Sequence, residues 1–316
     1  MKAVIFNQYG EADVLQYQDV AEPQIQPDQL LLKAYGTSVN PVDWKIRSRQ
    51  LQLLSGFNFP KSIGSDVSGV VVAIGEKVTE FKVGDLVYTF LNPLVGGACA
   101  EYVAVPAATT ALKPDNLSHT QAAAVPLAGL TALQALLDIG KIRAGQTVLI
   151  NGASGGVGSF AVQIAKVLQT TVTGVCSRAN LELVKQLGAD VAIDYTQTDF
   201  TQQPIQYDVI FDAVGKQSFY RCQNILKPDG IYISTLPTPE NLAAVAQTAL
   251  FPGQKAKLIL VQPNRRDLEA LRAWIEADQI QVIIDKTYPL SEMIQAHRQS
   301  QTGRTVGKIA IAIAPE

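Results

Sequence analysis

The sequence is poor in the residues that bind metal ions. It has three cysteines, Cys99, Cys176 and Cys222, and two histidines, His119 and His297, all far apart. A zinc site needs several Cys, His or carboxylate ligands, usually with some of them at short spacing along the chain. Because no such group can be assembled here, we expect no metal site. The cysteines are expected to be small buried side chains, Cys176 in a strand and Cys222 in a helix.

The sequence also lacks an excess of charge of either sign. Its 316 residues carry a net charge of −2, and the lysines and arginines are scattered. A nucleic-acid-binding surface requires clustered basic residues, so nucleic acid is not an expected partner. With 47% hydrophobic and 17% charged residues, the chain has the composition of a globular protein. Its length suggests two domains.

Long hydrophobic runs and targeting segments are missing as well. The chain begins with "MKAVIFNQYG", which is typical of an alternating strand and not of a signal or transit sequence. The most apolar stretch, "AAAVPLAGLTALQALL", is interrupted by Pro126, Gly129 and Thr131, so it is too short and too broken to span a bilayer. It predicts a buried helix instead. We expect a cytoplasmic protein with no membrane span.

What the sequence does have is a change of pattern near residue 120. The first third is rich in short strands separated by Gly and Pro, for example over residues 29–40, 65–75 and 84–90. Beyond residue 120, strands alternate with helices, which is typical of a doubly wound parallel sheet. The expected strands are residues 147–151, 171–176, 191–195, 207–215, 230–235 and 257–263. A helix over 290–300 and a strand over 307–314 follow, and they could return to the first domain.

One of these strands leads into a glycine-rich turn. The strand "TVLIN" (147–151) is followed by "GASGGVG" (152–158) and then by an amphipathic helix. Gly155 and Gly156 let the backbone approach a pyrophosphate, and Gly158 lets the helix press on the strand. The helix N-terminus favours negative charge. The alternative, a merely tight turn, would not need so many glycines, so the pattern predicts a dinucleotide site.

The end of the second strand indicates which dinucleotide binds. An NAD site places an acidic residue here, roughly 20 positions after the turn, to hold the ribose hydroxyls. This chain has Ser177 and Arg178 at that place, and Glu182 comes only in the next helix. A hydroxyl and a guanidinium suit a 2′-phosphate, so the sequence favours NADPH. The alternative is that Arg178 is an exposed loop residue.

These motifs and several others resemble those of a known family. The chain is similar, almost from end to end, to the medium-chain dehydrogenases/reductases, in their zinc-free branch of quinone oxidoreductases and alkenal/enone reductases. The stretches that carry the resemblance are "NPVDWKIR" (40–47), "GSDVSGVV" (64–71), "VPLAGLTALQAL" (125–136), "GASGGVG" (152–158), "CSRANLELVKQLGAD" (176–190), "DYT" (194–196), "DAVG" (212–215) and "TGRTVGKIAI" (302–311). Zinc-dependent relatives carry Gly-His-Glu where this chain has Gly64-Ser65-Asp66, which agrees with the missing metal ligands.

The resemblance implies an α/β protein of two domains. Residues 1–123 and 285–316 would form a GroES-like, β-rich catalytic domain. Residues 124–284 would form a Rossmann domain with a doubly wound parallel sheet that binds NADPH. The resemblance also implies a homodimer, with subunits joined through the edge of the Rossmann sheet.

Carried over position by position, the resemblance implies a set of cofactor contacts. Those of the Rossmann domain are Thr131, Ser154, Gly155, Gly156, Val157, Ser177, Arg178, Asn180, Tyr195, Val214, Ile233, Ile259, Leu260 and Val261. Those of the catalytic domain are Asn40, Lys45, Arg304 and Thr305. Lys45 is also the candidate catalytic residue, as a hydrogen-bond donor to the substrate or the ribose. Two alternatives stay open: Tyr195 as a plain strand-end tyrosine, and Lys45 as a solvated surface lysine. Family members often carry a lysine where Asn180 stands.

The implied reaction is hydride transfer from NADPH without a metal ion. Since no Lewis acid polarises the substrate, the acceptor must already be electrophilic, such as a quinone or an α,β-unsaturated carbonyl. Apolar residues in the loops 50–59 and 90–97 suggest that this small substrate is hydrophobic. The alternatives are an enoyl-thioester reductase and a low-turnover NADPH-binding protein, either a redox sensor or a crystallin-like protein.

Overall fold

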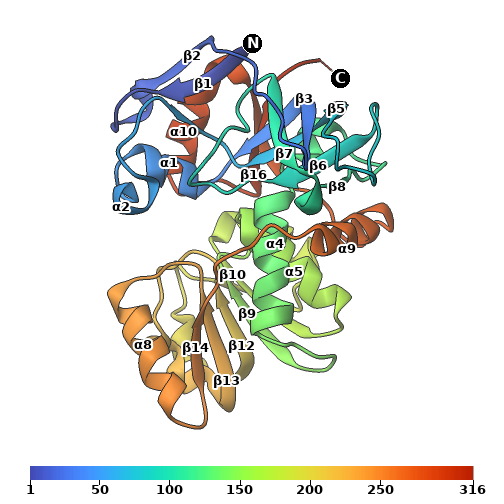
Figure 1. The fold of residues 1–316 in the computed structure, drawn as a ribbon. Helices are drawn as coiled ribbons and strands as arrows, with labels where there is room; N and C mark the ends of the chain where they lie inside the picture. Colours follow the sequence, from blue (N-terminus) through green and yellow to red (C-terminus); the bar gives the residue numbers. More distant parts are fainter. Residues whose placement is uncertain (316) are drawn as a thin grey trace. The chain divides into compact units, whose positions relative to one another are not determined.

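The structure is a computed structural model that describes residues 1–315 (Figure 1). These residues divide into two compact units. Unit 1 comprises Met1–Leu130, Pro263–Asp278 and the chain from Val282 on. Unit 2 comprises Thr131–Gln262 and Gln279–Gln281.

Unit 1 is built on two β-sheets. The larger has seven strands in the order β15-β16-β3-β5-β6-β8, with β7 paired to β3. Its strands are β3 (Gln29–Val39), β5 (Asp66–Ile74), β6 (Leu86–Phe90), β7 (Tyr102–Pro106), β8 (Ala111–Leu112), β15 (Ile284–Pro289) and β16 (Lys308–Ala312). The smaller sheet has β1 (Lys2–Phe6) between β2 (Leu15–Asp19) and β4 (Lys61–Ser62). The strands predicted over 29–40, 65–75 and 84–90 are therefore confirmed as β3, β5 and β6.

The first half of β3 shows why these residues form a half-covered sheet. Leu30, Leu32 and Ala34 are buried, and they alternate with more exposed neighbours. Successive side chains of a strand point to opposite faces, so the three share one face. They belong to a core cluster that also contains Val67 and Val71 of β5.

The helices of unit 1 come from widely separated parts of the chain. They are α1 (Pro41–Arg47), α2 (Gln52–Ser55), α3 (His119–Ala122), α9 (Arg265–Glu276) and α10 (Met293–Gln301). A 3-10 turn over Leu290–Glu292 precedes α10. The helix α4 (Pro126–Gln134) continues as a π-helical segment, Ala135–Ile139, and its residues are shared between the two units.

The C-terminal strand returns to the sheet of the first third. β16 pairs antiparallel with β3, with Ile309 opposite Val39 and Ile311 opposite Thr37. β15 pairs parallel to β16 and extends the sheet. The return suggested by the sequence is confirmed.

The helix α9 is assigned differently by the sequence and by the structure. The sequence places it in the Rossmann domain of residues 124–284, whereas its contacts place it in unit 1. Tyr88 Oη donates a hydrogen bond to the carbonyl oxygen of Leu268, at 2.6 Å. Asn116 Nδ2 donates to the carbonyl oxygen of Ile275, at 2.8 Å. These partners lie far away along the chain, so no local pattern indicates them.

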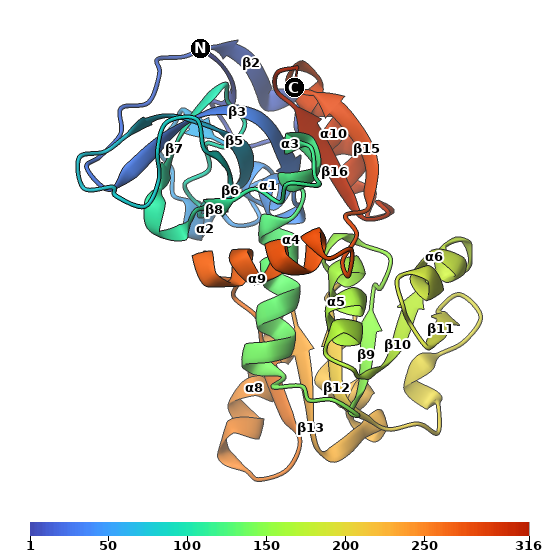
Figure 2. The same ribbon diagram turned by 90° about the vertical axis from the view of Figure 1, so that its right-hand side faces the viewer.

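Unit 2 contains a six-stranded sheet in the order β11-β10-β9-β12-β13-β14. Every neighbouring pair is parallel. Its strands are β9 (Thr147–Asn151), β10 (Thr171–Cys176), β11 (Val191–Asp194), β12 (Tyr207–Asp212), β13 (Leu226–Ser234) and β14 (Lys255–Leu258). Its helices are α5 (Gly156–Val167), α6 (Leu181–Gln186), α7 (Phe219–Cys222) and α8 (Pro239–Leu250). Figure 2 shows β9 between β10 and β12, where the chain order reverses. The predicted doubly wound Rossmann sheet is confirmed.

The last predicted strand of this sheet is wrong in its second half. The prediction covers residues 257–263, but β14 ends at Leu258. The backbone N–H of Gln262 donates to Gln134 Oε1 at 2.9 Å, and Gln134 Nε2 donates back to the carbonyl oxygen of Gln262 at 2.9 Å. This pair of bonds holds the chain to the helical segment of α4 instead of to the sheet.

The length predicted for the apolar helix is also wrong. Residues His119–Ile139 form a helical stretch of 21 residues that is long and apolar enough, by these criteria alone, to cross a membrane. The helix begins earlier than the apolar run, and Gly129 does not end it. Of its most apolar window, 83% is buried inside the protein, as predicted for a core helix.

A buried ammonium joins β16 to the first third of unit 1. Lys308 Nζ lies 3.4 Å from Asp66 Oδ2 and donates to Asn40 Oδ1, and both charged side chains are buried. Asp66 Oδ2 also accepts from Ser38 Oγ at 2.6 Å and from Asn40 Nδ2 at 2.8 Å. Asp66 Oδ1 accepts from the backbone N–H of Leu127, at 2.7 Å. One carboxylate thus ties three separate chain segments together.

We predict that Lys308→Met destabilises unit 1 by roughly 3–5 kcal/mol, because it leaves the buried Asp66 charge without its partner. Both tryptophans, Trp44 and Trp274, lie in unit 1, so tryptophan fluorescence during urea unfolding measures this free energy.

The matched control is Lys2→Met, which removes the exposed ion pair between Lys2 and Asp19. That loss is expected to change the free energy of unfolding far less, because solvent screens the exposed pair. An equal loss of unfolding free energy in the two variants would show that the buried pair stabilises the protein no more than the exposed pair.

Candidate functional site

The carboxyl ends of the parallel strands of unit 2 meet at one edge of the sheet. β9 ends at Asn151, whose register neighbours are Val175 of β10 and Asp212 of β12. The end of β11, Asp194, lies opposite Cys176 of β10. The chain order reverses between β9 and β12, and ligands of such sheets bind in the crevice outside that reversal point. The candidate site is therefore this edge.

The glycine-rich turn after β9 has the geometry of an anion cradle. Gly152 has a φ of +82°, and a Cβ on Gly158 would lie 2.0 Å from the carbonyl oxygen of Gly152. A Cβ on Gly155 would meet only that same oxygen, at 3.4 Å, so its outer side is open. Gly155, Gly156 and Val157 are half-exposed.

The helix that follows this turn presents its first backbone N–H groups without a cap. Gly155 is the N-cap of α5 and provides no side-chain hydrogen bond to the helix. The first N–H groups of a helix need an external acceptor, and the helix dipole favours an anion there. The turn and the helix therefore fit the pyrophosphate of a dinucleotide.

The glycine-rich turn and the loop after β10 each carry a hydroxyl whose proton stays available. Asn180 Nδ2 donates to Ser154 Oγ at 3.0 Å and to Ser177 Oγ at 3.3 Å. Since both oxygens accept from the same amide, each hydroxyl can still donate to an incoming anion. The sequence-predicted group of Ser154, Ser177 and Asn180 is thus brought together at the carboxyl edge.

Arg178 adds a positive charge to this loop. Its side chain is exposed and makes no hydrogen bond or ion pair with residues 1–315. The acidic residue that follows, Glu182, forms an exposed ion pair with Lys185 at 3.2 Å. No carboxylate stands at the end of β10 itself, where an NAD site has one. The loop suits a phosphate better than a pair of ribose hydroxyls.

Two further predicted contacts lie at the same edge. Tyr195 follows β11, and its backbone N–H donates to the carbonyl oxygen of Cys176 at 3.1 Å, which places it beside the loop of Arg178. Its side chain is 59% exposed. Val214 follows β12, and a Cβ on Gly152 would lie 2.2 Å from Val214 Cγ2. The Val214 side chain therefore covers the start of the glycine-rich turn.

The other predicted contacts of unit 2 differ in exposure. Ile233 is fully buried within β13, and Thr131 is buried on α4. In the segment after β14, Ile259 is buried and its N–H donates to the carbonyl oxygen of Ser234 at 3.1 Å. Leu260 is exposed and Val261 is half-buried.

The predicted contacts of unit 1 form two pairs. Asn40 is buried, and its amide is bound at both ends, to Lys308 and to Asp66, so its orientation is set. Lys45 is half-buried, and burial lowers the pKa of its ammonium. Its Nζ lies 5.6 Å from the centroid of a Trp44 ring, within the range of a cation–π contact.

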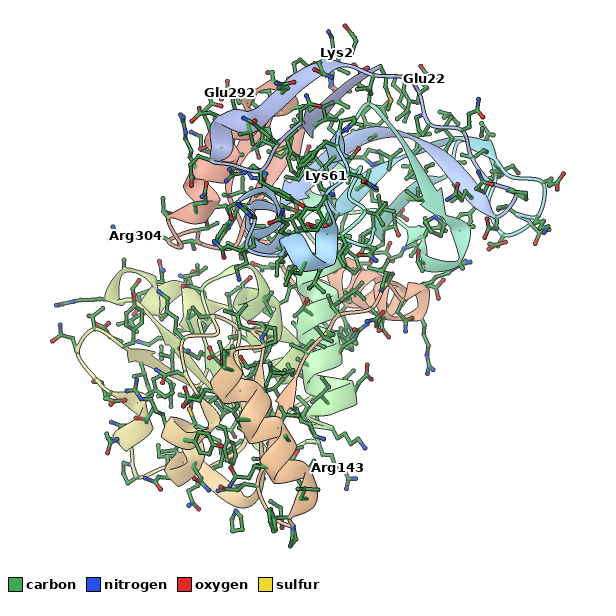
Figure 3. All side chains as sticks on the ribbon, turned by 60° about the vertical axis from the view of Figure 1, so that its left-hand side comes forward. Lys2, Glu22, Lys61, Arg143, Glu292 and Arg304 are labelled. Carbon is green, nitrogen blue, oxygen red and sulfur yellow. The ribbon has the colours of Figure 1, made fainter. Side chains whose placement is uncertain are left out.

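The second pair follows α10. Arg304, labelled in Figure 3, is exposed. Thr305 Oγ1 is buried and has no hydrogen-bond partner among residues 1–315. A buried polar atom without a partner is costly, so a ligand that bonded to Thr305 would be favoured.

Asp43 of this region has an unusually high pKa for a carboxylic acid. It is buried at the start of α1, where Asn40 N–H donates to Asp43 Oδ2 at 2.7 Å and Ser65 Oγ lies 3.4 Å from Oδ1. Burial raises the pKa of Asp43 to about 7; the Asn40 N–H opposes this shift, and the nearby Asp66 carboxylate adds to it. Its bond to the N-cap residue makes Asp43 part of the capping box of α1.

Among the described residues there is neither an exposed thiol nor a group of metal ligands. All three cysteines are free and buried, with Cys176 in β10 and Cys222 in α7, as predicted. Burial raises the pKa of Cys176 to about 11 and that of Cys222 to about 12, which keeps both thiols protonated. Within the part of the chain that the structure describes, no group of three or more His, Cys, Asp or Glu side chains could hold a metal ion.

Three polar residues that organise these regions, Asn151, Asp212 and Lys308, were not predicted from the sequence. Asn151 Nδ2 donates to Asp212 Oδ1 at 2.9 Å, across the reversal point. Lys308 orients the amide of Asn40. The sequence did contain a signal for Asn151 and Asp212, because each is a polar residue that ends an apolar strand. Lys308 is the first residue of a terminal strand and has no such signal.

The chain matches two family models over parts of its length and known proteins over its whole length. Residues 26–115 match the model "Alcohol dehydrogenase GroES-like domain", and residues 187–311 match "Zinc-binding dehydrogenase". The 2-methylene-furan-3-one reductase of Solanum lycopersicum is 36% identical over 328 residues, which cover all of this chain and 80% of that protein. The chloroplastic NADPH-dependent alkenal/one oxidoreductase of Arabidopsis thaliana is 33% identical, with the same coverage.

A solved structure agrees in fold. The quinone oxidoreductase from Coxiella burnetii superposes with a TM-score of 0.90, at 33% identity and with 99% of each chain covered. The predicted pairing of a GroES-like domain with a Rossmann domain is confirmed.

The pKa of Asp43 predicts a pH-dependent stability. The folded state keeps the Asp43 proton up to a pH of about 7, whereas the unfolded chain releases it near 3.8. Between these values the folded state binds more protons, so the free energy of unfolding contributed by Asp43 is lost as the pH rises from about 4 to about 7. Urea titrations of the wild type and of Asp43→Asn across this window isolate this contribution as the difference in unfolding free energy between them, which should fall as the pH rises. The exposed Asp28→Asn is the control, and equal slopes in the wild type and Asp43→Asn would contradict the prediction.

Proposed function

Because the chain belongs to the medium-chain dehydrogenase/reductase family, in its quinone oxidoreductase branch, we propose that it is an NADPH-dependent reductase. Its substrates would be quinones or the C=C bond of α,β-unsaturated carbonyls, such as enals and enones. The relatives named above are a furanone reductase, an alkenal/one oxidoreductase and a quinone oxidoreductase. The single observation that carries the cofactor assignment is the loop after β10, with its hydroxyls and an exposed guanidinium.

The choice of NADPH over NADH follows from the charge of that loop. Arg178 offers a fork of donors that matches phosphate oxygens, and Ser154 and Ser177 keep free hydroxyl protons. An adenosine ribose without a phosphate would leave these donors unused. The relative from Arabidopsis is itself named as NADPH-dependent.

The residues of unit 2 bind and orient the cofactor in this proposal. Gly155, Gly156 and Val157, with the N-terminus of α5, hold the pyrophosphate, while Tyr195 contacts the adenosine half. Val214 and the segment 259–261 bound the nicotinamide half. Bound NADPH supplies a hydride, and the protein holds the acceptor near it and excludes water.

The other contacts predicted for the two units are also part of this proposal. Thr131, Ile233, Asn40, Arg304 and Thr305 are assigned to the cofactor from the resemblance. Lys45 is proposed to donate a hydrogen bond to the oxygen of the acceptor on which negative charge develops, or to the ribose. Solvent then supplies the proton. No metal ligand is assigned, because the sequence lacks a set of them.

The oligomeric state and the location are proposals as well. A homodimer would form through the β14 edge of the parallel sheet, and a mass of twice 34.0 kDa in light scattering would support it. A cytoplasmic location is expected from the sequence, and recovery of the protein in the membrane fraction would contradict it.

We predict that the purified protein oxidises NADPH when a quinone or a short enone is added. The decrease of absorbance at the NADPH band, measured across quinones, enals, enones and an enoyl-CoA, tests this. A chelator should leave the rate unchanged. Turnover with the enoyl-CoA alone would favour the thioester reductase. Thermal protection by NADPH without turnover of any acceptor would favour the redox-sensor or crystallin-like alternative.

We predict that Arg178→Glu weakens NADPH binding far more than NADH binding. A charge-assisted hydrogen bond contributes about 1.5–3 kcal/mol, so the affinity for NADPH should fall at least roughly tenfold. Titration of each cofactor by fluorescence measures this ratio. Arg143→Glu, which changes an exposed residue just before the amino end of β9 (labelled in Figure 3), is the matched control. An equal loss for NADPH and NADH would show that Arg178 does not read the 2′-phosphate.

A further inference from the structure

Asp212 ends β12 at the reversal point of the parallel sheet, and it is fully buried. Its carboxylate is surrounded by donors from its own turn and from two other strands. Oδ1 accepts from Asn151 Nδ2 at 2.9 Å and from the backbone N–H groups of Val214 at 3.2 Å and Gly215 at 2.9 Å. Oδ2 accepts from the N–H of Gln217 at 2.9 Å and from Tyr232 Oη at 3.1 Å. A single carboxylate therefore organises the whole turn.

Close packing also fixes the turn of residues 213–217 against its neighbours. Gly215 has a φ of +72°, and a Cβ there would lie 2.4 Å from Leu236 Cγ. Val214 packs over Gly152 of the glycine-rich turn, as described above. The turns after β9, β12 and β13 are thus in contact, and Asp212 is the polar centre of this group.

The bonds to Asp212 decide what the turn can offer to a ligand. The N–H groups of Val214, Gly215 and Gln217 all point inward to the carboxylate. These three amides are therefore not available to a ligand, and the exposed groups of the turn are the side chains of Val214, which is 39% exposed, and Lys216. The Val214 side chain is an apolar surface against which a flat ring can pack.

We propose that Asp212 is a positioning residue for the nicotinamide half of the cofactor. It holds Val214 and Asn151 in place through its hydrogen bonds and does not touch the cofactor itself. The proposal rests on the NADPH site described under Proposed function. In a doubly wound sheet the two halves of a dinucleotide lie on opposite sides of the reversal point. The adenosine half uses the loop after β10, which Asp212 does not contact, so the two halves are separable by experiment.

The test compares two ligands on one variant. Asp212→Asn keeps the shape of the side chain but replaces an acceptor by a donor, so at least one N–H of the turn loses its bond. Because the turn that carries Val214 then loses its fixed conformation, NADPH should bind roughly 10-fold or more weakly. The fragment 2′,5′-ADP, which has only the adenosine half, should keep its affinity. Isothermal titration calorimetry measures both.

The matched control is Asp208→Asn, at the amino end of the same strand. Asp208 Oδ2 accepts from the N–H of Thr147 at 2.7 Å and from Lys227 Nζ at 2.7 Å, so it is also a bonded carboxylate. It lies at the edge of the sheet away from the candidate site. This variant is expected to lower stability and to leave both affinities unchanged.

The outcomes separate the inference from the proposed function. If the wild-type protein binds neither NADPH nor 2′,5′-ADP, the proposed function fails. If the wild type binds both and Asp212→Asn weakens both equally, or neither, the positioning role is wrong. If Asp212→Asn does not fold, Tyr232→Phe decides, since it removes one of the donors to Oδ2. A smaller but still selective loss of NADPH affinity in that variant supports the role, and no selective loss overturns it.

Discussion

The structure of unit 2 depends on the position of β9 between β10 and β12. Both neighbours pair with it in parallel; β10 and β11 lie on one side of β9, and β12, β13 and β14 lie on the other, so the chain order runs in opposite directions away from β9. This constraint brings the glycine-rich turn, the loop of Arg178 and the turn of Asp212 to one edge of the sheet. A parallel sheet has no other place where loops from so many strands meet. The binding site is a consequence of the strand order before any side chain contributes to it.

In each unit, a buried carboxylate serves to connect separate segments of the chain. Asp66 joins β5 to Ser38, Lys308 and the start of α4, and Asp212 joins β12 to β9, to β13 and to its own turn. A buried charged group is tolerated only when donors surround it, so these residues fix the conformation of the segments that supply the donors. The two differ in their partners. Asp66 has an ammonium beside it, whereas the donors to Asp212 within residues 1–315 are amides and a hydroxyl.

Much of this arrangement could be predicted from local patterns. The strands β9 and β10 begin and end where the sequence predicts them, because apolar runs bounded by turn residues are strong local signals. The glycine-rich turn was predicted for the same reason, since Gly152 and Gly158 are required by its geometry. The loop of Ser177 and Arg178 was predicted by counting from that turn. The assignment of α9 could not be predicted, because its partners Tyr88 and Asn116 lie in distant segments.

Local patterns in the sequence were enough to establish the class of the sheet and the position of the glycine-rich turn, and they predict a preference for a 2′-phosphate. These features depend on residues that are neighbours along the chain, so backbone geometry and local charge are sufficient to predict them. Only the tertiary structure decided that Asn40 is held by Lys308, that Asp212 collects the amides of its own turn, and that β14 ends at Leu258. Each of these results from hydrogen bonds between segments that the fold brings together, and the energy of such bonds depends on burial, which no single stretch of sequence shows.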